Sequence, residues 1–306
     1  MSRRAQTIIE EQTRRQAASH KWYLYRLGRV TASVFYDVCH AGVDKPPMIL
    51  LKRMCETQKP INAPGLKWGQ KQEKNARVAY QLRTMCLHED ATFQDTGLVV
   101  SLKDPYVGAS PDGLVSCSCC GDGVYELKCP LTAVNLTFHE ALELTSFCLE
   151  KTDNGVHLKR RHRYFYQVQL QKHCTERQYA DLAVWTPQWI HVERVTYDQA
   201  FIMEELDKAR TFFTKAVMPE LRAKWFTRHN KQTQSTDVPP RELAPMPQQQ
   251  VWCTCKGPEE GRMICCDNTT CQVQWYHFKC AGLKRAPRTK KRYCKSCSQN
   301  TKNWKC

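Results

Sequence analysis

Apolar residues recur at helical spacing along most of the first 225 residues. The longest patterns cover residues 66–84 and 197–225, and we expect an amphipathic helix over each. Shorter patterns predict helices over residues 32–40, 46–57 and 164–174. The apolar stripe of the last long helix is made of Phe201, Ile202, Leu206, Ala209, Phe212 and Phe213.

Short apolar or alternating runs lie between these helices and predict strands. The predicted strands cover residues 97–102, 106–109, 113–115, 124–129, 179–186 and 190–195. Helices that flank a small mixed sheet place this part of the chain in the α/β class.

Changes in composition divide the chain into four segments. Residues 1–21 are polar with helical propensity, and we expect an N-terminal helical extension. Residues 22–227 form the compact α/β domain. Residues 228–250 are rich in Gln, Thr, Ser and Pro and offer almost nothing to bury, which predicts a linker. A cysteine-rich finger follows over residues 251–306.

The charge balance indicates a polyanionic partner. Lys and Arg outnumber Asp and Glu by 46 to 30, a formal net charge of +16. Nucleic acid is the first candidate for such an excess. No apolar run approaches the roughly 18 residues of a membrane span, and the N-terminus lacks the apolar core of a signal peptide. We therefore expect an intracellular protein with no membrane partner.

Two acidic residues and a lysine are the main candidate catalytic residues of the α/β domain. Asp112 follows Pro111 at a turn, and Glu126 and Lys128 alternate along the next predicted strand. Side chains alternate along a strand, so Glu126 and Lys128 share one face and Leu127 points to the other. If the two strands pair as a hairpin, Asp112 lies beside Glu126.

Two adjacent carboxylates repel each other unless a cation lies between them. Hard oxygen ligands in small number suit Mg²⁺ or Mn²⁺, and the carbonyl of Leu127 offers another oxygen. Lys128 can then hold an attacking water or neutralise charge on a phosphate. This is the PD-x-ExK arrangement of metal-dependent nucleases. The alternative, on these three residues alone, is a solvated strand face.

Further polar residues lie on the neighbouring predicted helices. Glu73 offers a third carboxylate, and Tyr164 and Gln167 offer uncharged polar groups. Arg26 and Ser33 bring a guanidinium and a hydroxyl to a helix start, a position that favours a phosphate.

These blocks, in this order, resemble the YqaJ-type viral recombinases and the related lambda-exonuclease-like nucleases of the PD-(D/E)xK superfamily. The resemblance covers about residues 22–225. It implies a restriction-endonuclease-like mixed sheet flanked by helices, and a metal-dependent exonuclease that degrades double-stranded DNA from a 5′ end. The trimeric ring of the phage enzyme leaves a homo-oligomer as an open expectation.

The resemblance also implies roles for single residues. Asp112, Glu126 and the Leu127 carbonyl would hold Mg²⁺ or Mn²⁺, with Glu73 approaching them. Lys128 would serve the nucleophile. Gln167 and Tyr164 would support the site, and Arg26 and Ser33 would bind the terminal phosphate.

The sequence departs from this family in two places. The phage enzyme has an arginine eight residues after its motif glutamate, where this chain has Val134, which puts the 5′-phosphate preference and processivity in doubt. The turn between the paired strands carries Cys117, Cys119 and Cys120, with Cys129 nearby. A metal or iron–sulfur site is one interpretation. Ordinary thiols are the alternative, because no fourth ligand with usual spacing is visible.

The C-terminal segment has the Cys₄-His-Cys₃ order of a PHD finger, which predicts two closed Zn²⁺ sites. The interleaved order assigns one zinc to Cys253, Cys255, His277 and Cys280. It assigns the other zinc to Cys266, Cys271, Cys294 and Cys297, with Cys265 as a substitute for Cys266.

The finger also resembles PHD fingers that read methylated lysine. Trp252, Met263 and Trp275 stand where such readers wall a cage around a quaternary ammonium, and Asp267 stands where it can receive a basic peptide. The resemblance implies the histone H3 tail with a trimethylated fourth residue as ligand. The alternative is that Trp275 packs against the zinc core.

A basic run over residues 284–292 fits DNA binding, nuclear import or a solvated loop. The leading hypothesis is therefore a nuclear DNA exonuclease tethered to a chromatin reader, of mobile-element or viral origin. Two alternatives stay open: an inactive nuclease scaffold that binds histone H3, and an endonuclease of the same fold.

Overall fold

The computed structural model describes residues 1–56 and 63–232, and in the C-terminal part residues 253–255, 263–268, 271, 273, 275–283, 293, 294 and 297. The chain divides into two compact units, Met1–Thr236 and Asp237–Cys306. The expected linker at 228–250 lies largely outside the described residues. None of the described helices is both long enough and apolar enough to cross a bilayer.

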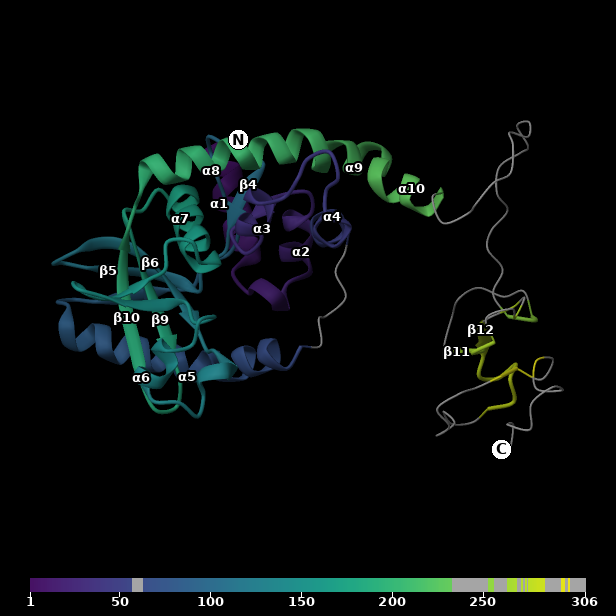
Figure 1. Cartoon of the computed structure of the whole chain (residues 1–306). Coiled ribbons are helices and arrows are strands. Elements are labelled where there is room, and N and C mark those ends of the chain that lie inside the picture. The colour runs from purple at the N-terminus through teal and green to yellow at the C-terminus, as the bar shows by residue number, and fades with distance from the viewer. Residues whose placement is uncertain are drawn as a thin grey trace. The chain divides into compact units, whose positions relative to one another are not determined.

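The first unit is a mixed α/β structure, as the sequence pattern predicted (Figure 1). Its main helices are α1 (Arg3–Thr13), α2 (His20–Arg26), α3 (Phe35–Cys39), α4 (Met48–Cys55), α5 (Pro64–Leu87), α6 (Phe138–Leu142), α7 (Arg163–Thr175), α8 (Gln199–Phe212), α9 (Met218–Ala223) and α10 (Trp225–Gln232). Its strands are β1 (Val30–Thr31), β2 (Thr92–Gln94), β3 (Val99–Val100), β4 (Val107–Ala109), β5 (Gly113–Cys117), β6 (Gly121–Lys128), β7 (Leu149–Thr152), β8 (Gly155–Leu158), β9 (Tyr179–Trp185) and β10 (Ile190–Thr196).

A five-stranded sheet in the order β10-β9-β6-β5-β2 forms the centre of this unit. Strands β6 and β9 are parallel, and the other neighbours are antiparallel. Helix α5 covers one face, where its Ala76 and Tyr80 pack on Tyr125 and Leu127 of β6. Helix α7 covers the opposite face, where Val168 packs with apolar residues of β6 and β9 (Figure 1). Helices α5 and α7 therefore cover opposite faces of β6.

A smaller sheet, in the order β1-β4-β3, lies under the N-terminal helix. Ile9 of α1 packs with Leu98 and Val100, and the Thr13 hydroxyl accepts a hydrogen bond of 2.7 Å from the Leu98 amide. A side chain at Gly97 would stand only 2.0 Å from the carbonyl oxygen of Glu10. Helix α1, which the sequence pattern placed in an extension, is thus packed onto the α/β unit.

The long helix expected over residues 197–225 is interrupted in the structure. A π-helical turn over Phe213–Val217 separates α8 from α9, and Lys224 ends α9 with φ +50°. Pro219 has no N–H to donate into the preceding turn, which favours a wider turn at this position. Buried Glu220 then accepts hydrogen bonds from the Phe226 and Thr227 amides.

The second unit contains a short antiparallel pair, β11 (Met263–Cys265) and β12 (Trp275–His277). In the described part of this unit the buried cluster is formed mainly by cysteines, with Tyr276 and Tyr293 packed against them. Side-chain sulfurs thus occupy the place that aliphatic residues fill in the first unit.

Candidate active site and metal centres

The hairpin of β5 and β6 brings the predicted acidic residues together. Gly113 pairs with Tyr125, so Asp112 lies level with Glu126 at the start of β5. The backbone amide of Leu127 donates a hydrogen bond of 2.6 Å to Oδ2 of Asp112. This bond fixes the Asp112 carboxylate against the middle of the neighbouring strand.

Glu126 is buried under helix α7, with only 4% of its surface exposed. Its Oε1 accepts from Nε2 of Gln167 at 2.5 Å and from Nζ of Lys128 at 2.6 Å. Its Oε2 accepts from Nε2 of Gln171 at 2.6 Å. These donors compensate a carboxylate that burial alone would make unfavourable, and they hold it in one orientation.

Lys128 lies on the same face of β6 as Glu126, as alternation along the strand predicted. Its Nζ donates to Oε1 of Gln167 at 3.1 Å and lies 4.5 Å from the centre of the Tyr164 ring. Burial opposes the charge of this amine, but Glu126, Tyr164 and Asp112 outweigh that effect and raise the pKa of Lys128. The side chain is therefore an ammonium at neutral pH.

Asp112 is close enough to Glu126 to be perturbed by its charge. Burial and the neighbouring charge of Glu126 raise the pKa of Asp112 to about 8. A divalent cation between the two carboxylates would remove this repulsion. The buried Oε1 of the Gln171 amide also has no hydrogen-bond partner within the described region. The donor set therefore fits a hard cation such as Mg²⁺ or Mn²⁺.

Glu73 lies farther from the centre of the site than the other two acids. It is on α5, its side chain is 48% exposed, and its Oε1 is 3.3 Å from the Arg77 guanidinium. In the described ranges, every group of three or more candidate metal ligands within 4.8 Å consists of Cys and His residues. Glu73 thus does not form a close triad with Asp112 and Glu126, although its charge contributes to the raised pKa of Asp112.

The sequence did not single out Gln171, and it placed Arg77 on the helix of Glu73 without a role at the site. Gln171 bonds Glu126 directly, and it lies four residues after Gln167 on the same helix face. Arg77 bonds the Tyr125 hydroxyl at 2.5 Å and connects Glu73 to the site. The i, i+4 spacing of the two glutamines was the available signal. Gln169, two residues after Gln167 on the same helix, instead bonds the backbone of Thr196 and Asp198.

Arg26 and Ser33 lie together, as the sequence predicted. The Arg26 guanidinium donates to Ser33 Oγ at 3.2 Å and stacks 4.0 Å from the centre of the Trp22 ring. The Trp22 indole donates to Oγ of Ser110, two residues before Asp112. Burial lowers the pKa of Arg26 to about 10, and no carboxylate of the described residues forms an ion pair with it. A guanidinium in this setting is suited to bind an anion beside the acidic site.

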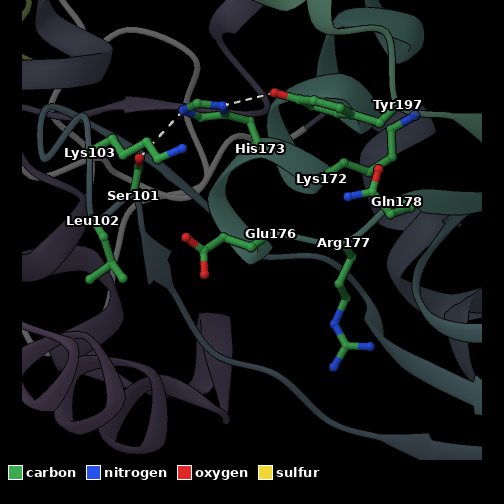
Figure 2. Close-up of a pocket in the computed structure, with 9 residues that line it drawn as sticks. All are labelled: Ser101, Leu102, Lys103, Lys172, His173, Glu176, Arg177, Gln178 and Tyr197. Carbon is green, nitrogen blue, oxygen red and sulfur yellow. Dashed lines mark hydrogen bonds between the residues drawn. The ribbon is translucent and has the colours of Figure 1, made fainter.

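A separate polar pocket lies at the other end of α7 (Figure 2). Its lining includes Lys172, His173, Glu176 and Tyr197. The imidazole of His173 is engaged at both nitrogens, by Ser101 at 3.5 Å and by the Tyr197 hydroxyl at 3.2 Å. The pocket contains neither Asp112 nor Glu126, so it is not the expected metal centre.

The finger ligands converge in two groups of four, in the interleaved order that the sequence predicted. Cys253, Cys255, His277 and Cys280 form one group, and Cys266, Cys271, Cys294 and Cys297 form the other. In the first, His277 Nδ1 lies 3.3 Å from Cys255 Sγ. In the second, the Cys271 and Cys294 sulfurs are 3.8 Å apart. Cys265 lies on β11 opposite Trp275 and outside both groups. The soft donor set and its closure by four protein ligands fit structural Zn²⁺.

The structure describes some of the predicted peptide-binding residues. Trp275 is 40% exposed, whereas Tyr276 packs against the cysteine cluster. Asp267 is exposed. Trp252, the side chain of Met263 and the basic run at 284–292 lie outside the described residues.

Comparison with known proteins agrees with this two-part arrangement. A family model described as the YqaJ-like viral recombinase domain matches residues 21–178. An alkaline exonuclease from Laribacter hongkongensis superposes with a TM-score of 0.50 at 23% identity, covering 70% of this chain and all of that one. A complex of KSHV SOX with RNA gives a TM-score of 0.51 at 15% identity, covering 72% of this chain and 76% of that one. The first unit thus has an exonuclease fold.

The C-terminal region is homologous to ING-type PHD fingers. It is 39% identical over 59 residues to the PHD finger protein ING1 of Arabidopsis thaliana, which is 19% of this chain and 25% of that protein. The chain spans about a quarter of the length of the first curated relatives that it matches. The similarity therefore concerns the finger alone.

Proposed function

Because the chain belongs to the YqaJ-like viral recombinase domain family, we propose that its first unit is a metal-dependent exonuclease that hydrolyses double-stranded DNA from a 5′ end. The observation that carries this proposal is the group of Asp112, Glu126 and Lys128 on the β5–β6 hairpin. Lys128 donates to buried Glu126 at 2.6 Å, and the Leu127 amide between them donates to Asp112 at 2.6 Å. The net charge of +16 supports a nucleic-acid substrate.

Asp112, Glu126 and the Leu127 carbonyl would hold Mg²⁺ or Mn²⁺, with Glu73 approaching from α5. When bound, the cation polarises the phosphoryl oxygen and lowers the pKa of a water. Gln167 and Gln171 keep the Glu126 carboxylate oriented through hydrogen bonds of 2.5 and 2.6 Å. Lys128, as an ammonium next to Tyr164, stabilises the negative charge that develops on the phosphate.

The end of the DNA would be held by Arg26 and Ser33. Arg26 is half-buried, stacked on Trp22 and without a carboxylate partner among the described residues, which supports a phosphate as its ligand. Val134 stands where the phage enzyme has an arginine. We therefore expect a weaker preference for a 5′-phosphate over a 5′-hydroxyl end than that enzyme has.

Digestion of labelled DNA tests this proposal. Full-length protein is incubated with 5′-labelled linear duplex, circular duplex and RNA, with and without Mg²⁺. We expect nucleotide release from the linear duplex only, dependent on the cation, and lost in Lys128→Met. Lys151→Met changes an exposed lysine of β7 and is the matched control. Cleavage of the circular duplex would indicate an endonuclease rather than an exonuclease. No cleavage of any substrate would favour an inactive scaffold.

We propose in addition that the finger holds two Zn²⁺ and binds a histone H3 tail with a methylated lysine. The two groups of four ligands support the zinc assignment. The exposure of Trp275 at 40%, on a strand whose neighbour Tyr276 already packs on the cysteines, supports a ligand-binding role for this ring. With Trp252, Met263 and Asp267 it would form the peptide site and direct the nuclease to chromatin in the nucleus.

Peptide titration tests the second proposal. Full-length protein is titrated with H3 tail peptides that carry an unmodified or a trimethylated fourth residue. We expect tighter binding of the trimethylated peptide, and a loss of about 10-fold of that preference in Trp275→Ala. Equal affinity for both peptides would contradict a methyl-lysine cage in this finger. Chromatin targeting depends on this binding, whereas the mobile-element or viral origin is inferred from the pairing of the two domains. Failure here leaves the nuclease proposal intact.

A further inference from the structure

The turn between β5 and β6 gathers a third set of metal-ligand side chains. Cys117 ends β5, Cys119 and Cys120 lie in the turn, and His88 approaches from the C-terminal end of α5. Their four ligand atoms all lie within 4.8 Å of one another. His88 is 29 residues before Cys117, which is why the short-range spacing of the cysteines did not reveal a fourth ligand.

The separations inside this set match those around a single tetrahedral ion. Zn–S bonds of about 2.3 Å and a Zn–N bond of about 2.0 Å place sulfurs about 3.8 Å apart and sulfur and nitrogen about 3.5 Å apart. Cys119 Sγ lies 3.6 Å from the sulfurs of both Cys117 and Cys120. His88 Nδ1 lies 3.3, 3.8 and 3.4 Å from the sulfurs of Cys119, Cys117 and Cys120.

The finger clusters provide an internal standard for this comparison. There, His277 Nδ1 lies 3.3 and 3.9 Å from the sulfurs of Cys255 and Cys280, and the Cys271 and Cys294 sulfurs are 3.8 Å apart. The third set thus has the same internal spacing as the two finger sets. A disulfide needs sulfurs about 2.05 Å apart, and it gives no reason for a histidine nitrogen to lie at similar distances from all three sulfurs.

The backbone around the three cysteines is held in place independently of any ion. The Ser118 amide donates to the Glu89 carbonyl at 3.1 Å, and the Ser118 hydroxyl donates to Asp90 at 2.9 Å. Gly121 closes the turn with φ +70°, which a glycine adopts readily. These contacts join the turn to the residues that directly follow His88, so the ligands are already arranged before a metal arrives.

Arg194 adds a charge that suits a metal site. Its guanidinium is paired with Asp181 at 2.8 Å and lies near the side chain of Cys120. Three thiolates, a neutral imidazole and one Zn²⁺ carry a net charge of about −1. A neighbouring guanidinium stabilises such a charge, just as basic groups stabilise thiolates elsewhere.

We propose that His88, Cys117, Cys119 and Cys120 bind one structural Zn²⁺. Binding releases the thiol protons of the three cysteines and uses the unprotonated Nδ1 of the histidine. Four protein ligands close the coordination shell, so the ion has no open position for a substrate. The site lies about 17 Å along β6 from Glu126, at about 3.4 Å per residue, which also separates it from the catalytic chemistry.

The site would join the helix that carries Glu73 to the hairpin that carries Asp112 and Glu126. Without the ion, the hydrogen bonds of Ser118 and the pairing of β2 with β5 would connect the end of α5 to the hairpin. We therefore expect the metal to stabilise the first unit without taking part in hydrolysis. This inference depends neither on nuclease activity nor on peptide binding.

Zinc analysis of the full-length protein tests the inference. Purified without added metal, the wild-type chain should contain three Zn²⁺ by elemental analysis and native mass spectrometry. Cys119→Ser and His88→Gln should each contain one ion fewer. Cys86→Ser alters an exposed cysteine two residues from His88 and should retain the wild-type content. The difference of one ion identifies this site even if the finger sites are empty. Equal zinc in wild type and both variants, or iron in place of zinc, would overturn the proposal.

Thiol protection provides a test that needs no variant and remains valid if the substitutions prevent folding. Cys86 and Cys119 are both exposed. Under brief alkylation, mapped by peptide mass spectrometry, we expect Cys86 to react at once and Cys119 to react only after a chelator is added. Equal rates before chelation, or a disulfide within the turn, would contradict a bound ion.

Discussion

The two units of this chain are stabilised in different ways. The first has apolar cores on both faces of a five-stranded sheet, built from fully buried residues such as Val168, Leu182 and Tyr80. In the described part of the second, the buried cluster is Cys266, Cys271 and Cys294. A domain of the first kind can fold by burying apolar surface, whereas a short segment of the second kind depends on its metals.

The two units also differ in whether the residues of the proposed functional site stabilise the fold. In the finger, the proposed zinc ligands would both stabilise the fold and position Trp275, so loss of metal should remove both stability and the proposed peptide binding. In the first unit the carboxylates lie on one face of β6 beside a core that does not include them. Activity and stability can therefore be separated there by single substitutions.

Removal of zinc should have the largest effect, and an unequal one. Structural zinc contributes about 10–16 kcal/mol to the folding of small fingers, so chelation should abolish H3 peptide binding altogether. The first unit should keep its sheet, with a lower melting temperature caused by loss of the turn site. Circular dichroism and peptide titration before and after chelation would measure both. Peptide binding that survives chelation would contradict the proposed dependence of the second unit on its metals.

Substitution of the buried carboxylate should separate activity from stability. Glu126→Gln keeps the shape of the side chain but removes its charge, so DNA hydrolysis should fall by about 10³-fold or more, roughly 4 kcal/mol or more. Thermal unfolding and peptide binding should be nearly unchanged. Glu150→Gln, at an exposed position of β7, is the matched control. A variant that unfolds while the control does not would show that Glu126 holds the fold as well.

A core substitution should affect the first unit alone. Phe212 is fully buried in the cluster between α8 and the small sheet, so Phe212→Ala should lower the free energy of unfolding by about 3–5 kcal/mol. Denaturant unfolding with H3 peptide binding as a second readout would measure this. A simultaneous loss of peptide binding would mean that the units do not fold separately.

The smallest expected effect concerns pH. Lys172 is fully buried, its Nζ donates to the Val195 carbonyl at 2.9 Å, and burial lowers its pKa to about 7. The unfolded chain, with a lysine pKa near 10.4, binds more protons above pH 7. The contribution of Lys172 to stability should therefore rise by about 1 kcal/mol per pH unit from pH 7 to 9. Lys172→Met should remove this slope, and an unchanged slope would mean that Lys172 is charged in the fold.

The sequence predicted most of the helices and strands that position the site, because those elements bury one face at regular spacing. It also predicted that Asp112, Glu126 and Lys128 meet, since they belong to one hairpin and strand alternation fixes their faces. Gln171 and His88 were missed because their partners are 45 and 29 or more residues away, and only tertiary packing brings them together. The break between α8 and α9 was also missed, although Pro219 marked it.

The central claim is that Asp112 and Glu126 share divalent cations. Titration of full-length protein with Mn²⁺, followed by electron paramagnetic resonance, tests it most directly. The account predicts saturable binding that is lost in Asp112→Asn and in Glu126→Gln and is retained in Glu150→Gln. Mn²⁺ binding of equal affinity in all four proteins would contradict it.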